Sequence, residues 1–397
     1  MLNEKKSKIQ HEALTLWIEN NKIGSCEIIT GLGKTFLALN ALYTMPKNDD
    51  IHLFLAETVD RQKDLNDDII KYNKLFKRNV YKDYNLKFHC YQTVYKWKNK
   101  LFGLIIADEC HDSLSPAYSR FYFNNSYKAI MGLSATINRK KKYEKEGYTK
   151  GDLLDKIAPV IYTYTVDQAQ IDETSRPLNV YIINHKLDMI NKNIKAGSKT
   201  KVFYQSELAA YSYWDREHKK SWFIENQDKK DLKIRITSTK RSNLLYNLPS
   251  KIPIVKELLS NIKGKTILFG NSLNSLLQVT PNVVSSKNSE DKNKEIREAF
   301  EQNKISTIGS FKKLKQGANL TDLDNCIMMS YYSTEGDAIQ RWGRLRNNGK
   351  IGNVFILLTQ NTQEEVWFNK MFQNINNLNM IYCPSLEFCL KKYKESN

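Results

Sequence analysis

The chain has 397 residues, of which 41% are hydrophobic and 26% are charged. This length predicts two or three domains. No run of about 18 apolar residues occurs and the N-terminal residues carry no apolar core, which argues against a membrane span and against secretion. The formal net charge of +18 predicts a polyanionic partner, with nucleic acid as the first candidate. Accumulation of lysine from an AT-rich coding sequence is the alternative.

The six cysteines are spread singly through the chain, without a C-x-x-C pair. Cysteines with this spacing are not expected to bind zinc or to form a redox-active pair. Free thiols are typical of a reducing compartment, so the composition predicts a cytoplasmic protein.

Residues 1–165 are predicted to form a parallel α/β domain. Short apolar strands are expected at 27–29, 51–55, 104–106 and 129–131, with helix-length polar-faced segments between them. A last helix and strand over 153–164 lead out of the domain, which places the boundary near residue 165.

Residues 166–397 predict a second domain of the same class. Its strands are expected at 178–187, 265–269, 306–308, 326–329 and 354–358. Residues from about 188 to 250 are strongly charged and aromatic-rich without a strand pattern, so they predict a basic helical insertion. The fold class is therefore α/β, with two parallel-sheet domains in tandem and a cleft between them.

A glycine-containing loop follows the first strand and precedes a helix: Thr30-Gly31-Leu32-Gly33-Lys34-Thr35. Glycines let backbone N–H groups approach phosphates, and the helix N-terminus favours negative charge. Lys34 is suited to bridge the terminal phosphates and Thr35 to hold magnesium. The full G-x-x-x-x-G-K-T spacing fails because Ile28 stands at the first glycine position. An ordinary glycine turn is the alternative.

An acid pair ends the strand near residue 105. Asp108 lies where a carboxylate can hold magnesium through its water shell, and Glu109 lies where it can polarise the attacking water. A solvated acidic turn is the alternative. Together with the loop at Lys34, this pair predicts a site for Mg²⁺ and ATP.

The order of these elements resembles superfamily 2 helicases and translocases, whose third motif is matched by Ser134-Ala135-Thr136. The resemblance implies two RecA-like domains and coupling of the nucleotide site to domain movement. It also implies that Gln10 reads the adenine edge, for which a glutamine on a helix surface is the alternative. The D-E-C-H sequence at Asp108 to His111 is similar to that of phage UvsW-type helicases, which remodel branched DNA.

The second half of the chain continues the resemblance. Gly317 lies in a match to the fifth motif, and Gln340, Arg341 and Arg344 lie in a match to the sixth, Q-R-x-G-R-x-x-R. The resemblance implies nucleotide contacts from these residues and an arginine finger at Arg344. The last arginine position of the motif holds Asn347. Arg346 lies one residue early, a rotation of about 100° on a helix, and its role stays open.

Two further positions have equally weighted interpretations. Thr93 resembles the family's residue that contacts the phosphodiester backbone. The alternative is a threonine that is present for its β-strand propensity. His111 senses the nucleotide, or is an ordinary buried or solvated histidine. The segment 56–62 resembles motif Ia but has Glu57 where many relatives have proline.

Residues 186–251 contain fifteen Lys and Arg against seven Asp and Glu, a block that predicts a nucleic-acid surface. Its candidate contacts are Lys219, Lys220, Lys229, Lys230, Lys240 and Arg241, which we expect to lack acidic partners. Aromatic residues are interleaved with these charges and are expected chiefly to hold the inserted helices on the second domain. A solvated basic face is the alternative.

These features predict an ATP- and Mg²⁺-dependent helicase or translocase of nucleic acid, with DNA favoured over RNA. Lys34, Asp108, Glu109, Gln340 and Arg344 are its expected catalytic residues. A monomer without membrane contact, working with replication, recombination or transcription proteins, fits this interpretation. The alternatives are a double-strand translocase subunit that does not separate strands and a nucleotide-gated binding protein without turnover.

Overall fold

The computed structural model describes residues 2–198, 200–311, 320, 322–331, 341–343, 345 and 349–396. The chain separates into two compact units between Ser175 and Arg176. This division falls later than the boundary expected near residue 165. The short helix α8 (Val166–Ile171) stays with the first unit because the hydroxyl group of Tyr164 bonds to Asp172 and Thr174, directly after that helix.

The first unit is built on a six-stranded parallel sheet with the order β3-β2-β4-β5-β1-β8. Its strands are β1 (Ile23–Ile28), β2 (Ile51–Ala56), β3 (Asn85–Cys90), β4 (Leu101–Asp108), β5 (Ser126–Ser134) and β8 (Val160–Tyr164). The predicted apolar strands all lie in this sheet. Strand β3 was not predicted because it is an edge strand, in which exposed polar residues interrupt the apolar pattern.

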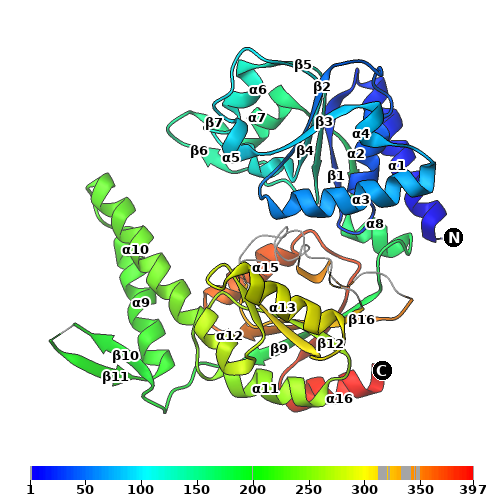
Figure 1. Cartoon of the computed structure of the whole chain (residues 1–397). Coiled ribbons are helices and arrows are strands. Elements are labelled where there is room, and N and C mark those ends of the chain that lie inside the picture. The colour runs from blue at the N-terminus through cyan, green and yellow to red at the C-terminus, as the bar shows by residue number, and fades with distance from the viewer. Residues whose placement is uncertain are drawn as a thin grey trace. The chain divides into compact units, whose positions relative to one another are not determined.

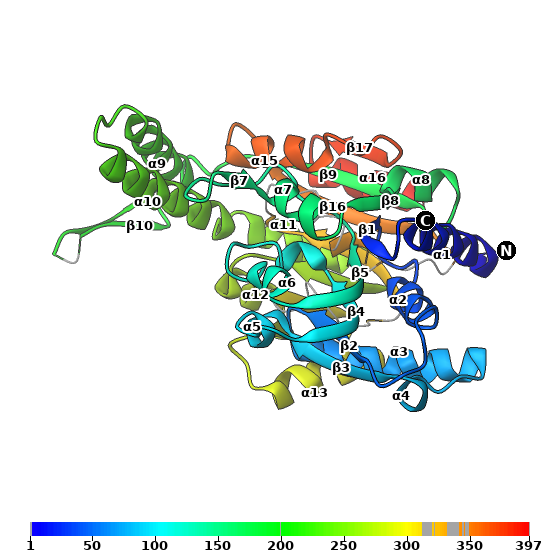
Figure 2. The same ribbon diagram turned by 90° about the horizontal axis from the view of Figure 1, so that it is seen from above.

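Helices cover both faces of this sheet, as Figures 1 and 2 show, with α1 to α3 on one side and α5 to α7 on the other. The helices are α1 (Leu2–Glu19), α2 (Lys34–Leu42), α3 (Asp60–Phe76), α4 (Val80–Asp83), α5 (Tyr91–Val94), α6 (Arg120–Asn124) and α7 (Lys150–Ile157). A short hairpin joins β6 (Lys142–Tyr143) and β7 (Tyr148–Thr149). Helix α1 is fixed to the sheet by the fully buried Trp17, whose indole Nε1 donates to the carbonyl of Ile130 at 2.8 Å.

The second unit contains a seven-stranded parallel sheet with the order β13-β14-β12-β15-β16-β9-β17. Its strands are β9 (Leu178–His185), β12 (Lys265–Phe269), β13 (Val283–Ser285), β14 (Thr307–Phe311), β15 (Leu323–Met328), β16 (Gly352–Thr359) and β17 (Asn379–Cys383). The accompanying helices are α11 (Lys251–Asn261), α12 (Leu273–Val279), α13 (Glu290–Glu301), α15 (Gln363–Phe372) and α16 (Leu386–Ser396). Two parallel-sheet α/β domains confirm the predicted fold class.

The segment predicted as a helical insertion contains two long helices, α9 (Glu207–Ser221) and α10 (Gln227–Tyr246). It also contains an antiparallel hairpin that was not predicted, formed by β10 (Ile194–Gly197) and β11 (Val202–Gln205). Figure 1 shows both parts extending away from the sheet of the second domain. Of the residues that the structure describes, no helix is long and apolar enough to cross a membrane.

A buried polar network holds the insertion at its root. The buried Glu207 accepts hydrogen bonds from the backbone N–H groups of Asp188 and Ser250, and from the Ser250 hydroxyl at 2.6 Å. Nε2 of His185 lies 2.8 Å from that same hydroxyl oxygen. Because the Ser250 proton is directed to Glu207, His185 is the donor to Ser250, and its Nδ1 is left to accept from Thr359 at 3.1 Å. This donor pattern is that of neutral His185, because burial disfavours the charged imidazolium.

We expect this network to make stability depend on pH. Burial, followed by the charge of Lys251, lowers the pKa of His185 from 6.5 to about 3. As the pH falls, the unfolded chain binds the His185 proton at a higher pH than the folded protein does. The contribution of neutral His185 to the free energy of unfolding is therefore complete above pH 6.5 and decreases by about 1.4 kcal/mol per pH unit as the pH drops toward 3. Urea unfolding at about pH 7 and pH 5 should show that the free energy of unfolding falls by about 2 kcal/mol more in the wild type than in His185→Gln, which keeps the other histidines whose pKa burial lowers. An equal loss in both proteins would contradict this role of His185.

Candidate nucleotide site and nucleic-acid surface

Three predicted motifs converge at one edge of the first sheet. The loop with Lys34 follows β1, the acid pair with Asp108 ends β4, and Ser134 ends β5. Strand β5 lies between β4 and β1, and all three run parallel. The carboxyl ends of parallel strands share one edge, where ligands of open α/β sheets bind.

The loop between β1 and α2 depends on two glycines in left-handed conformation. Gly31 has φ of 89° and Gly33, the residue that caps α2, has φ of 80°. A Cβ atom on Gly33 would lie 2.5 Å from the side-chain nitrogen of Gln10. The buried Ile28 is the last residue of β1 and not part of the turn. The backbone N–H groups at the start of α2 can therefore bind phosphate although the first glycine of the usual pattern is missing.

Gln10 lies against this loop and not on a free helix surface. Its Nε2 donates to the carbonyl of Leu32 at 2.8 Å, which ties α1 to the phosphate loop. Thr30, Gly31, Leu32 and Gly33 complete the segment that was predicted to bind the nucleotide. The amide of Gln10 is thus placed beside the loop, where it can meet a base.

Lys34 and Glu109 face each other across the site. Lys34 Nζ lies 3.5 Å from Glu109 Oε1 and donates to the carbonyl of Ile28 at 3.2 Å. Both side chains are largely buried, with 12% and 17% of their surface exposed. Glu109 has φ of 46°, a conformation that turns its carboxylate out of the strand direction at the end of β4.

Ser134 and His111 connect the acid pair to the third motif. The Ser134 hydroxyl lies 3.4 Å from Glu109 Oε2 and 2.8 Å from His111 Nδ1, and it donates to the carbonyl of Thr136. His111 Nε2 lies 3.4 Å from Asp112. The Ser134 hydroxyl therefore connects Glu109 directly to the loop after β5. His111 is partly buried inside this network.

Arg61, at the start of α3, is a site residue that the sequence did not reveal. Its Nε donates to Asp108 Oδ2 at 2.6 Å and its Nη2 donates to Thr35 Oγ1 at 2.8 Å. Burial disfavours the charged guanidinium, but the carboxylates of Asp108, Asp68 and Asp64 together outweigh this cost and raise the pKa of Arg61. Only its position in the motif Ia segment could have signalled it, since an arginine without a known partner has no distinctive pattern.

Thr35 and Asp108 have the chemistry of magnesium ligands. A hydroxyl and a carboxylate oxygen suit Mg²⁺, which commonly takes one or two protein ligands and completes its shell with phosphates and water. Among the described residues, no cluster of three or more His, Cys, Asp or Glu could hold a metal. With Thr35 and Asp108 as protein ligands, most of the coordination shell of Mg²⁺ would be left to phosphates and water.

The predicted second-domain site residues are placed only in part. Gly317, Gln340 and Arg344 lie outside the described residues, as do Arg346 and Asn347. Arg341 is described and is buried, with 3% of its surface exposed. Its guanidinium donates to the carbonyl of Ser330 at 2.8 Å and lies over the ring of Phe269. These contacts hold Arg341 within its own domain.

The predicted nucleic-acid residues differ in their surroundings. Thr93 is exposed on α5 and lies in a helix, so its interpretation as a strand threonine is wrong. Lys229 and Lys240 are exposed, and in the part of the chain that the structure describes neither has an acidic partner. Lys219 lies 2.8 Å from Asp215, and Lys220 lies 3.4 Å from Glu217.

The expectation that the basic residues of the insertion lack acidic partners is therefore wrong for three of them, and most clearly for Arg241. This residue is buried and bonds to Asp215 at 2.6 Å and to Gln363 at 2.7 Å. It joins α10 to α9 and to α15. The sequence next to Arg241 contains no acid, but the fold brings Asp215 into contact with it. Through these contacts Arg241 fixes the insertion in place.

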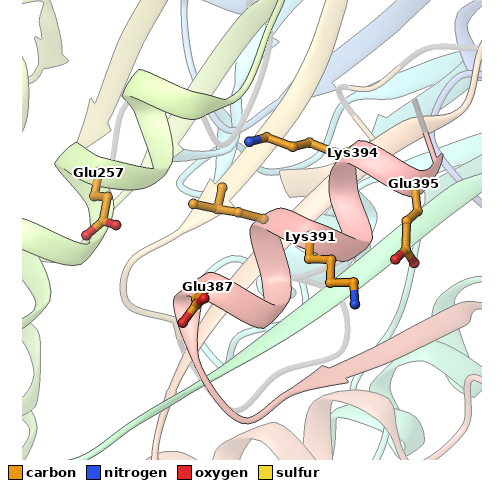
Figure 3. A pocket seen from close by; sticks show the side chains of 6 residues that line it. Glu257, Glu387, Lys391, Lys394 and Glu395 are labelled. Atoms are coloured by element: carbon orange, nitrogen blue, oxygen red, sulfur yellow. The ribbon is translucent and has the colours of Figure 1, made fainter.

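A hollow between α11 and α16 of the second domain carries none of the predicted motifs. Figure 3 shows its lining side chains, which are Glu257, Glu387, Leu390, Lys391, Lys394 and Glu395. Three carboxylates beside two lysines do not form a cationic cradle for phosphate. This hollow therefore does not provide the phosphate-binding chemistry that the motifs predict.

Residues 5–139 match the family model described as the type III restriction enzyme res subunit. This range contains the phosphate loop, Arg61, the acid pair and the Ser-Ala-Thr segment. The chain is 25% identical over 384 residues to DNA 3'-5' translocase XPB2 of Sulfurisphaera tokodaii, covering 89% of this chain and 82% of that protein. The fold, the site and these matches are similar to those of superfamily 2 helicases and translocases.

Solved structures share the fold over almost the whole chain. Dbp5 of S. cerevisiae, bound to RNA and ADP BeF3, aligns with a TM-score of 0.63 at 12% identity, over 98% of this chain and 93% of that one. The ATP-dependent Type ISP restriction-modification enzyme LlaBIII, bound to DNA, aligns with a TM-score of 0.59 at 14% identity over 98% of this chain. This chain spans 32% of that enzyme's length. Both likenesses show a fold of two RecA-like domains.

Proposed function

We propose that this protein is a DNA-dependent ATPase that binds Mg·ATP at the edge formed by β1, β4 and β5. The observation that carries the proposal is the convergence of Lys34, Thr35, Asp108 and Glu109 at that edge. Lys34 binds the terminal phosphates, while Thr35 and Asp108 hold the cation. Bound Mg²⁺ would neutralise phosphate charge and thereby support attack by water.

Glu109 has the position of the residue that orients the attacking water and accepts its proton. Its present partner, Lys34, is the same lysine that a terminal phosphate would attract. Nucleotide binding would therefore free the Glu109 carboxylate for water. Gln340 and Arg344 are proposed to complete the site from the second domain, with Arg344 stabilising the transferring phosphoryl group.

DNA is the proposed substrate because the named relative is a DNA translocase and because the net charge of +18 attracts a polyanion. Thr93 and the lysines of the insertion are proposed contacts with the strand. The similarity to UvsW-type helicases at Asp108 to His111 favours branched DNA within this class.

A second candidate is a motor that moves along duplex DNA without separating its strands. It is favoured by the match to a restriction-enzyme subunit model and by the fold shared with a Type ISP enzyme. Both candidates use the same ATPase site, so only the mechanical output separates them.

The test is ATP turnover measured in parallel with single-stranded DNA, forked DNA, duplex DNA and RNA. Stimulation by DNA above RNA is expected. Displacement of a labelled strand from the fork identifies a helicase, whereas displacement of a triplex-forming oligonucleotide from uninterrupted duplex identifies a translocase. Turnover without stimulation by any nucleic acid would contradict the proposal.

We expect the exposed lysines of the insertion to contribute to DNA affinity. Changing Lys219, Lys220, Lys229 and Lys240 to Gln should weaken duplex binding and flatten the plot of log affinity against log salt, by up to about 0.9 per lost phosphate contact. Lys229 and Lys240 should account for most of the change because Lys219 and Lys220 are already paired with acids. ATP hydrolysis without DNA should persist.

The matched control neutralises four exposed lysines of the second domain outside the insertion. These are Lys256, Lys304, Lys391 and Lys394. The control lowers net charge equally, so a similar change in slope would show that general charge, and not the insertion, sets affinity. Arg241 is left intact in both proteins because it supports the attachment of the insertion.

A further inference from the structure

Arg61 joins the two side chains that are proposed to hold the cation. Its guanidinium lies 2.6 Å from Asp108 and 2.8 Å from Thr35, and only 16% of the arginine side chain is exposed. The same oxygens would lie about 2.1 Å from a directly bound Mg²⁺, or one water molecule away from it. A guanidinium and a dication cannot share that space, because their volumes overlap and their charges repel.

We propose that Arg61 is a built-in competitor of the divalent cation, so that Mg·nucleotide binds only when the guanidinium leaves Asp108 and Thr35. This inference rests on the proposed nucleotide site and adds a control element to it. Arg61 is a positioning residue in this scheme. It holds the two ligands in register before the cation arrives and sets the cation concentration that the site requires.

The structure also offers a second position for the guanidinium. Asp68 lies on the same helix, α3, and its Oδ2 is 3.8 Å from Arg61 Nη1. Asp64 lies between them in the sequence and also favours the charge of Arg61. Residues three and seven positions after Arg61 lie on its side of the helix. A rotation of the arginine side chain toward these acids would release Asp108 without leaving the guanidinium unpaired.

The test measures binding and not turnover. A fluorescent, non-hydrolysable ATP analogue is bound to the full chain, and Mg²⁺ is titrated for wild type, Arg61→Gln, Arg61→Lys and Asp68→Asn. Arg61→Gln keeps a hydrogen-bond donor but removes the charge, so the half-saturating Mg²⁺ concentration should fall about tenfold, a typical size for coupling between two sites. Arg61→Lys should stay near wild type. Asp68→Asn should raise the requirement because it weakens the second position.

Arg120→Gln is the matched control, since Arg120 is an exposed arginine at the start of α6. Thermal unfolding of each variant shows whether it is folded. If Arg61→Gln is unstable, the test rests on Asp68→Asn alone, which should raise the half-saturating Mg²⁺ concentration. An unchanged Mg²⁺ requirement in the folded variants overturns the role of Arg61 while the nucleotide site stands. Failure of the wild type to bind the analogue at any Mg²⁺ concentration overturns the proposed function itself.

Discussion

Replacing Lys34 by Ala should eliminate ATP hydrolysis and strongly weaken ATP binding while leaving the protein folded. The ammonium group is the one cation of the phosphate loop, and its loss removes charge stabilisation from both the bound phosphates and the transition state. The loss of a single such donor lowers turnover by about two to three decades. Steady-state ATP hydrolysis and binding of a labelled nucleotide measure the two effects separately.

Lys34 makes few structural contacts, which is why the fold should survive. Within the described residues, its side chain has one hydrogen bond, to the carbonyl of Ile28, and one ion pair, with Glu109. Lys128→Ala is a suitable control, because it removes the ion pair to Asp50 in the same domain at a surface position. Wild-type turnover in Lys34→Ala would show that the loop after β1 does not bind ATP.

Glu109→Gln should behave differently, retaining nucleotide and losing turnover. Glutamine has the same shape but cannot accept the proton of the attacking water. Loss of a general base costs about two to four decades in rate. Removing the carboxylate also frees Lys34 from its ion pair at 3.5 Å, so ATP affinity should be unchanged or higher. Single-turnover hydrolysis together with nucleotide binding in the same preparation tests both statements.

Asp112→Asn is the control for this experiment. Asp112 lies three residues along the chain, and its carboxylate is 3.4 Å from Nε2 of the same histidine, His111. Its turnover should stay within a few-fold of wild type. If Glu109→Gln hydrolyses ATP at the wild-type rate, the assignment of Glu109 as the water-positioning residue is wrong.

The features that could be predicted are those marked by a local pattern of neighbouring residues. Strands inside the two sheets, such as β2, β4 and β16, are buried on two faces, so each appears as a short, nearly continuous apolar run. The phosphate loop and the acid pair each directly follow such a run. Because parallel strands end at a common edge, their convergence followed from the pattern alone.

The hairpin β10–β11 shows where this reasoning fails. Its strands have only four residues each, and Val202, Phe203 and Tyr204 are about half exposed. Without a buried face, the sequence has no alternation that marks a strand. Pairing across the turn, and not the composition, produces this element.

The sequence by itself determined the two α/β domains and the phosphate and acid motifs of the first, because these depend on local periodicity and on residues a few positions apart. Tertiary structure decided which charges are available. Arg61 meets Asp108 across 47 residues and Arg241 meets Gln363 across 122. The strength of an ion pair or hydrogen bond depends on the distance between the two groups in space. The positions of the two partners along the chain do not reveal that distance. For that reason one arginine expected on the surface is structural, and another without a predicted role contacts Asp108 and Thr35, the proposed cation ligands.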